Sequence, residues 1–82
     1  MSFSSAMELP KDLEKGTIVL TALGRQELHI ENHKGLLEFE PDCIRVLCRK
    51  GRITIRGEGL WIRYYDREDI HVTGTIQEIE YS

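Results

Sequence analysis

The sequence predicts a small all-β protein, an antiparallel β-sandwich or roll of roughly seven to eight short strands preceded by a short N-terminal arm or helix. Three observations lead to this fold class. Short runs of alternating apolar and polar residues follow one another through most of the 82 residues. Glycine, or a cluster of proline, aspartate or asparagine, closes each run. No segment has the apolar period of about 3.6 residues that marks a long amphipathic helix.

Two parts of the chain differ in pattern. Residues 1–16 mix apolar and charged side chains around Pro10, which fits only the first turn of a helix, so this part is expected to be an arm or a short helix. Residues 17–82 are expected to form a single β domain, because a chain of this length can bury only one compact core. The expected strands are 17–23, 26–31, 36–40, 43–49, 52–57, 60–65, 70–74 and 75–80.

The register of these strands follows from the rule that a slip of one residue turns every apolar side chain outward. Three hairpins result, with turns at 32–35, 49–50 and 58–59. The predicted opposite pairs are Ile30 with Leu37, Leu28 with Phe39, Val46 with Ile53, Ile44 with Ile55, Gly57 with Leu60, Ile55 with Ile62, and Ile53 with Tyr64. Two inward rows, Ile44-Ile55-Ile62 and Val46-Ile53-Tyr64, are then the predicted core.

The same alternation sends a basic and aromatic set of side chains to the outer face of this predicted meander. Its members, the candidate partner-binding residues, are Arg45, Arg52, Arg56, Trp61, Arg63 and Tyr65. Arg56 is expected directly opposite Trp61, where a cation–π contact is possible. Charge is segregated along the chain as well: residues 1–42 carry a net charge of −4, residues 43–65 of +5, and residues 66–82 of −4.

Three functions are open to such a face. It could bind another protein or a second copy of the chain, it could bind anionic lipid or nucleic acid through arginines and stacking aromatics, or it could simply be solvated. The overall acidic balance makes non-specific binding to nucleic acid weak. Protein interaction is therefore the favoured hypothesis, no nucleic acid is expected as a partner, and homo-oligomer formation stays open.

The segment 31–35 groups Glu31, His33 and Lys34, side chains that can perform acid–base chemistry. The register gives it no nucleophile and no oxyanion site, so the chain is not expected to be an enzyme, to have catalytic residues or to bind a small-molecule substrate. A turn made by Asn32, His33, Lys34 and Gly35 is expected instead, with a contact to a partner as its other possible role.

Neither a metal nor another cofactor is expected. Cys43 and Cys48 fall on opposite faces of one strand, and His29, His33 and His71 lack metal-ligand spacing. Asp66, Glu68 and Asp69 do not fit a calcium loop, because Arg67 intervenes and the glycine and final glutamate are missing. The first residues lack the basic start and apolar stretch of a secretory signal, which predicts a cytoplasmic location.

Four segments carry a resemblance that extends from about residue 9 onward. They are LPKD at 9–12, LHIENHKGLLEF at 28–39, GRITIRGEGL at 51–60 and VTGTIQEIEY at 72–81. In this order and spacing the sequence resembles the YabP/YqfC sporulation protein family, and most of all its YqfC branch. The two cysteines of 43–49 and the aromatic run at 61–65 depart from the usual pattern of that family.

The resemblance implies a small β-sandwich-like protein of endospore-forming bacteria that is made in the mother cell and required for sporulation. It also implies a membrane-associated partner protein encoded nearby, through which the chain would lie peripheral to a membrane. The family has no established catalytic residues, so none is carried over. The expected function is thus that of a non-enzymatic sporulation accessory protein acting as a protein-interaction module.

Overall fold

The computed structural model describes residues 17–82, and the expected arm or helix at 1–16 lies outside the described residues. Six strands make up the ordered elements, and there is no helix among residues 17–82. The strands are β1 (Val19–Leu23), β2 (Glu27–Glu31), β3 (Gly35–Glu40), β4 (Cys43–Cys48), β5 (Gly51–Tyr65) and β6 (Asp69–Tyr81). The all-β prediction is confirmed.

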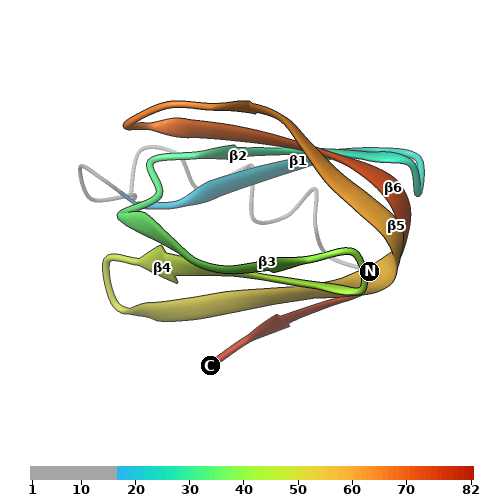
Figure 1. Ribbon diagram of the computed structural model, residues 1–82. Coiled ribbons are helices and arrows are strands. Elements are labelled where there is room, and N and C mark those ends of the chain that lie inside the picture. Colours follow the sequence, from blue (N-terminus) through green and yellow to red (C-terminus); the bar gives the residue numbers. More distant parts are fainter. Residues whose placement is uncertain (1–16) are drawn as a thin grey trace.

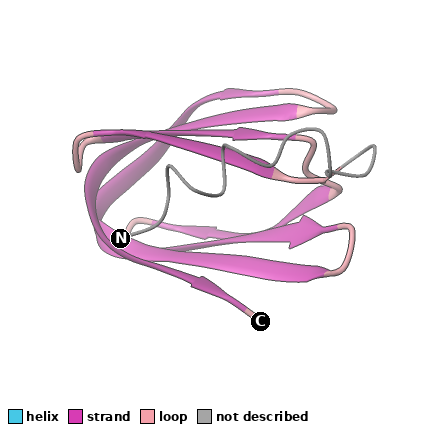
Figure 2. Cartoon of the chain, turned by 180° about the vertical axis from the view of Figure 1, so that it is seen from behind, coloured by secondary structure: helices cyan, strands magenta, loops and turns pink. Residues whose placement is uncertain are grey.

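All strand pairs are antiparallel, and the order across the sheet is β1-β2-β6-β5-β4-β3. The two long strands, β5 and β6, run through the whole sheet and bend near their middles (Figure 1). On one side of the bend β6 pairs with β2, and on the other side β5 pairs with β4. The β1–β2 half therefore lies above the β3–β4 half, and the view from behind shows the same two facing parts (Figure 2).

Glycines make this bend possible. Gly59 has a φ of 61° and Gly74 a φ of 125°, both in the region that side-chain-bearing residues avoid. A Cβ atom at Gly74 would lie 2.8 Å from the Cα of Leu60, and one at Gly57 would collide with the carbonyl oxygen of Thr75. Because these positions have no side chain, β5 and β6 can pass close to each other where the sheet turns.

The core lies between the two halves of the bent sheet. It consists of Leu20, Leu28, Ile30, Ile44, Val46, Ile53, Ile55, Leu60, Ile70 and Val72. Each is an alternate residue of its strand that points inward, or, for Leu60, a residue at the bend. Burying one such aliphatic side chain is worth about 1.5–3 kcal/mol, so this cluster is the main source of stability.

One of the three predicted hairpins is confirmed. β4 and β5 join at residues 49–50, with Ile44 opposite Ile55 and Val46 opposite Ile53, as the alternation requires. Both pairs are fully buried. The local turn and the inward apolar pattern agree here, which is why sequence reasoning succeeded.

The predicted hairpin at 32–35 is wrong. β2 lies between β1 and β6, so Leu28 faces Ala22 and Val72, whereas Phe39 of β3 faces Ile44. The segment after β2 crosses from one half of the sheet to the other. β2 already has a neighbour on each side, and no edge remains for β3.

The predicted hairpin at 58–59 is wrong as well. β5 continues through this segment, Glu58 pairs with Thr75, and Ile62 lies opposite Val72. Tyr64, expected in the core, is 52% exposed. The glycines form a bend instead of a reversal, so the expected runs 52–57 and 60–65 merge into β5, and 70–74 and 75–80 merge into β6. Six strands thus replace the seven to eight expected.

Candidate functional site

The basic and aromatic face expected from the sequence is divided between the two halves of the sheet. Arg56 lies opposite Cys43 and Glu78, before the bend, whereas Trp61 lies opposite Thr73, beyond it. The expected position of Arg56 opposite Trp61 is therefore wrong. Of the six candidate residues, Arg45, Arg52 and Arg56 belong to the β3–β4 half, and Trp61, Arg63 and Tyr65 to the other.

Two of the arginines have carboxylate neighbours. Arg45 Nε lies 3.5 Å from Glu38 Oε1, and Arg56 lies 3.8 Å from Glu78 through Nε and from Glu80 through Nη2. These partly exposed pairs add little stability, typically below about 1 kcal/mol each. Their effect on the surface is larger, because acidic residues of β3 and β6 offset the positive charge that the sequence places on β4 and β5.

An aromatic pair joins the two halves of the sheet. The rings of Phe39 in β3 and Trp61 in β5 meet edge to face, with centroids 5.7 Å apart and planes at 66°. This geometry is favourable for aromatic quadrupoles. Phe39 is nevertheless 40% exposed and Trp61 61% exposed, and Leu37, near Phe39 on β3, is 49% exposed. We call Leu37, Phe39 and Trp61 the aromatic seam.

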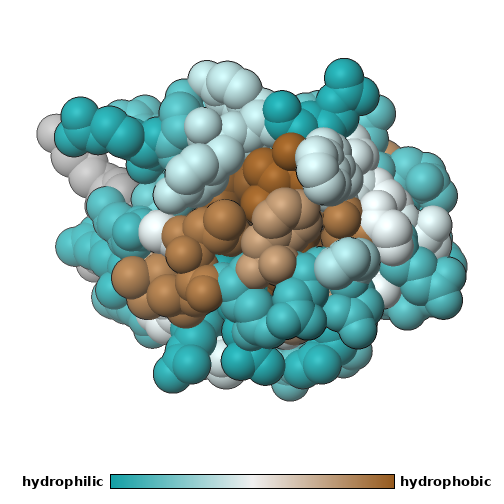
Figure 3. All heavy atoms as spheres, viewed as in Figure 1, coloured by the Kyte–Doolittle hydropathy of each residue, from teal (hydrophilic) through white to brown (hydrophobic). Residues whose placement is uncertain are grey.

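The backbone holds the aromatic seam in place. β3 is an edge strand, and within the described chain its only ladder is to β4. At one end of the seam the N–H of Leu60 donates to the carbonyl oxygen of Pro41 over 2.8 Å. On the face drawn in Figure 3, hydrophobic residues gather in the middle and hydrophilic residues surround them. The seam is thus a prearranged apolar surface next to an edge strand.

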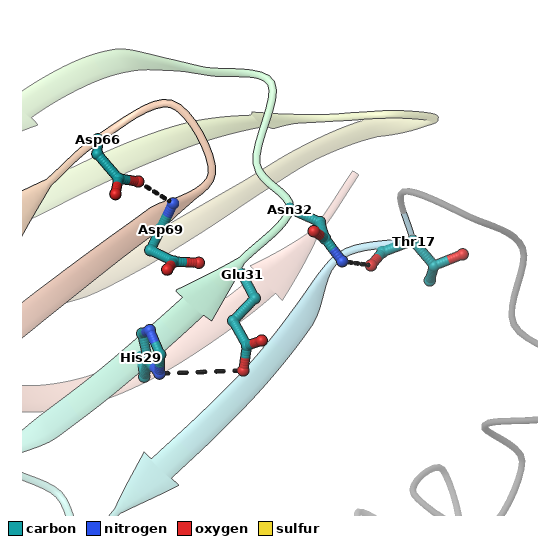
Figure 4. Close-up of polar contacts among 6 residues, drawn as sticks. All are labelled: Thr17, His29, Glu31, Asn32, Asp66 and Asp69. Carbon is teal, nitrogen blue, oxygen red and sulfur yellow. Dashed lines mark hydrogen bonds and ion pairs between the residues drawn. The ribbon is translucent and has the colours of Figure 1, made fainter.

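The crossover at 32–35 ties β2 to the turn between β5 and β6. Asn32 has a φ of 68°, its N–H donates to the carbonyl oxygen of Glu68 over 2.7 Å, and its Nδ2 donates to the carbonyl oxygen of Thr17 over 2.9 Å (Figure 4). Asparagine tolerates this backbone conformation better than most residues. The expected turn residues therefore lie together. They link the end of β2 to Thr17 and to the β5–β6 turn, and they do not form a hairpin.

His33 of this crossover is buried, with 4% of its surface exposed. Its Nε2 lies 2.7 Å from the carbonyl oxygen of Asp66. Because a carbonyl only accepts, Nε2 must carry the proton, and Nδ1 is buried without a hydrogen-bond partner among residues 17–82. The ring also stacks on Tyr65, with centroids 5.3 Å apart. His33 and Tyr65 thus lie in one packed contact, and Tyr65 is the last residue of β5.

Asp66 organises the β5–β6 turn. Its Oδ1 accepts hydrogen bonds from the N–H groups of Glu68 (2.9 Å) and Asp69 (2.7 Å), and its Oδ2 accepts one from the hydroxyl of Tyr64 (2.6 Å). The bond from Tyr64 is the first cause, and the two backbone bonds the next, of a pKa of Asp66 below its usual value. The same bond raises the pKa of Tyr64.

The remaining reactive side chains do not form a metal-binding group. Among residues 17–82 no three His, Cys, Asp or Glu side chains come together as metal ligands. Cys48 packs against the core, and burial raises the pKa of its thiol. No helix within the described residues is long and apolar enough to cross a membrane.

Comparison with known proteins identifies the family. A profile of the YabP family matches residues 13–82, which is most of the chain. This chain belongs to the YabP family. An uncharacterised protein named YqfC from Bacillus subtilis (strain 168) is 34% identical over 76 residues, which cover 93% of this chain and 82% of that protein. The YabP/YqfC resemblance seen in the sequence is confirmed.

The sequence pattern indicates only part of the aromatic seam. Trp61 is among the candidates, but the predicted register places Phe39 and Leu37 inside a hairpin that does not form. Phe39 does point to the same side as the buried Ile44. What exposes it is the position of β3 at the sheet edge, and alternation within one strand contains no signal for that position.

Proposed function

We propose that this YabP-family protein is a non-enzymatic sporulation accessory protein that acts as a protein-interaction module. Its proposed partner is a membrane-associated sporulation protein. In this proposal the chain works in the mother-cell cytoplasm and reaches the membrane only through that partner. The role in sporulation rests on the family resemblance, whereas the mode of action rests on the surface of the molecule.

One observation supports the interaction function above the others: the aromatic seam lies exposed beside an edge strand. Contiguous groups of exposed apolar side chains mark interaction surfaces, whereas single exposed ones do not. Tryptophan and other aromatics are enriched among the residues that dominate binding energy. The edge-to-face contact between Phe39 and Trp61 holds both rings ready before any partner binds, which lowers the entropy cost of association.

We further infer that the bent sheet behaves as one rigid unit, a small antiparallel roll spanning residues 17–82. Backbone bonds from Leu60 to Pro41 and from Gly57 to Asp42 connect the β3–β4 turn to the bend. Bonds from Gly74 to Gln26 and from Ile76 to Arg25 connect the β1–β2 turn to it. A roll of this kind gives the seam a rigid support, as interaction sites on rigid elements require.

Direct binding of anionic lipid or nucleic acid has weaker support. Arg45 and Arg56 have carboxylates within 4 Å, and Trp61 is separated from both by the bend. A phosphate at Arg45 or Arg56 would have to compete with these carboxylates and would lack Trp61 as an adjacent stacking platform. Protein binding through the aromatic seam requires neither an unpaired arginine nor an arginine beside a stacking ring.

The test is affinity capture of the tagged protein from sporulating cells, with the bound proteins identified by mass spectrometry. The double variant Phe39→Ala and Trp61→Ala should lose a membrane protein that the parent chain retains. Leu23→Ala is the matched control, because Leu23 is about as exposed as Trp61 but lies on β1. This control should retain the partner.

Two results would contradict the proposal. The first is equal recovery of the partner with the seam variant and with the parent. The second is salt-sensitive binding of the purified parent protein to anionic vesicles or to a single-stranded oligonucleotide, lost when Arg45 and Arg56 are replaced by glutamine; this would favour the lipid or nucleic-acid alternative.

A further inference from the structure

The corner next to the aromatic seam is acidic. Glu40 follows Phe39 at the end of β3, Asp42 lies in the next turn, and Glu58 lies in β5 at the bend. All three side chains are exposed, and none forms an ion pair with another described residue. We call Glu40, Asp42 and Glu58 the acidic corner.

Backbone hydrogen bonds bring the acidic corner and the seam together. The N–H of Leu60, next to Trp61, donates to the carbonyl oxygen of Pro41, next to Glu40. The N–H of Gly57, next to Glu58, donates to the carbonyl oxygen of Asp42 over 3.2 Å. The backbone positions of Glu40, Asp42 and Glu58 are therefore close to those of Phe39 and Trp61.

The other charged residues near the seam are either paired with an opposite charge or lie farther from the bend. Glu38 of β3 already has a partner in Arg45. Arg63 lies beyond Trp61, farther from the bend along β5. The surface is thus apolar along the seam and negative at the corner, and a ligand that fits it must have the complementary order of chemistry.

We propose that the seam and the acidic corner together bind an extended segment of a protein partner in which apolar residues are followed by lysine or arginine. The inference rests on the proposed interaction function and names the chemistry of the partner. The apolar side chains lie on Phe39 and Trp61, and the basic ones lie over Glu40, Asp42 and Glu58. An extended chain advances about 3.3 Å per residue, so a segment of about five residues spans about 16 Å.

Charge complementarity selects this occupant. Opposite charges across an interface raise the association rate and exclude partners of the wrong sign. An anionic membrane surface or a nucleic acid would be repelled by the three carboxylates. A second copy of the chain that met this one corner to corner would place carboxylates against carboxylates.

The test uses the fluorescence of Trp61, the single tryptophan of the chain. The probe is a synthetic capped peptide with about three valine or leucine residues followed by about two lysines, and its control has glutamate in place of each lysine. The lysine peptide should shift the Trp61 emission to shorter wavelength in a saturable manner, and added salt should weaken binding. The glutamate peptide should cause no saturable shift.

Charge reversal tests the corner itself. The triple variant Glu40→Lys, Asp42→Lys and Glu58→Lys should bind the lysine peptide at least about tenfold more weakly. For a single exchange, Glu58→Lys is compared with Glu68→Lys, which changes the charge equally but in the β5–β6 turn. Only Glu58→Lys should weaken binding, and thermal unfolding followed by circular dichroism checks that each variant folds.

Three outcomes would overturn the inference. They are equal affinity for the lysine and glutamate peptides, equal effects of the two single exchanges, and a concentration-dependent dimer that Trp61→Ala abolishes. If seam variants lose the cellular partner and the triple charge variant retains it, the proposed function stands and this inference falls. If the seam variants and the triple charge variant all retain the partner, the proposed function itself is contradicted.

Discussion

Gly57 in β5 and Thr75 in β6 lie so close together that any side chain at Gly57 would collide with the carbonyl oxygen of Thr75. The contact is at the bend that brings the two halves of the sheet over one another. It determines where the core closes and where the aromatic seam lies. The absence of a Cβ atom at Gly57, together with that at Gly74, allows the close approach of the two strands at the bend.

Gly57→Ala should destabilise the protein by more than about 2 kcal/mol, because the backbone of β6 must move to make room. Gly24→Ala is the comparison, since Gly24 has a φ of 64° but no atom within 4 Å of the position that a Cβ would take. That change costs only the backbone strain of about 1–2 kcal/mol. Urea unfolding measures both, and a smaller loss for Gly57→Ala than for Gly24→Ala would contradict the steric role of Gly57.

Truncation of core and surface residues tests the register beyond the bend. Ile55→Ala should cost about 2–5 kcal/mol, because Ile55 is fully buried. Tyr64→Ala should cost less than about 1 kcal/mol, since its ring is half exposed. A hairpin at 58–59 would instead bury Tyr64 beside Ile53. Comparable losses of unfolding free energy for the two variants in denaturant unfolding would therefore support that hairpin and contradict the bend.

His33 should contribute to stability through the crossover. His33→Ala removes the bond to the carbonyl of Asp66 and the stacking on Tyr65 and is expected to cost about 2–3 kcal/mol. His33→Phe keeps a stacked ring and should cost about 1 kcal/mol. Lys34→Ala, at the exposed neighbour, should stay within about 0.5 kcal/mol. Thermal unfolding would contradict this role if the two alanine variants matched.

The Tyr64–Asp66 pair should make the β5–β6 turn sensitive to acid. The pKa of Asp66 is lowered in the folded state, so its contribution to stability is complete above the usual carboxyl range and is lost as the pH falls through the lower folded value. Tyr64→Phe removes the main cause and should move the pKa of Asp66 upward. A carbon-detected NMR titration measures it, and an unchanged pKa in the variant would exclude the assigned cause.

Cys48 should react slowly with alkylating reagents. The thiolate is the reactive form, and burial raises the pKa of the Cys48 thiol, so little thiolate exists at neutral pH. In a Cys43→Ser variant, which leaves Cys48 as the single cysteine, iodoacetamide should label the folded protein more slowly than the protein in urea. Equal rates in the two conditions would show that Cys48 is accessible.

The fold was predictable where local pattern and contact coincide. Ile44, Val46, Ile53 and Ile55 lie in strands joined by a short turn, so alternation gave both their partners and their burial correctly. Prediction failed at the glycines near the bend, because glycine permits a reversal, a bulge or a close crossing, and only the partner strand decides among them. The strand pattern therefore identified Trp61 as an outward-facing candidate. Its contact with Phe39 depends on which strands are neighbours, and the pattern did not predict that contact.

The order of residues alone sets the strand character of the chain, most of the inward apolar set, the family and the segregation of charge, because each of these can be read without knowing which strands are neighbours. The three-dimensional fold decides that pairing, places carboxylates beside Arg45 and Arg56, and brings Phe39 and Trp61 together beside the acidic corner. These relations join residues far apart in the chain, and they depend on how closely β5 and β6 approach at Gly57 and Gly74. Backbone proximity of that kind leaves no periodic trace in a sequence.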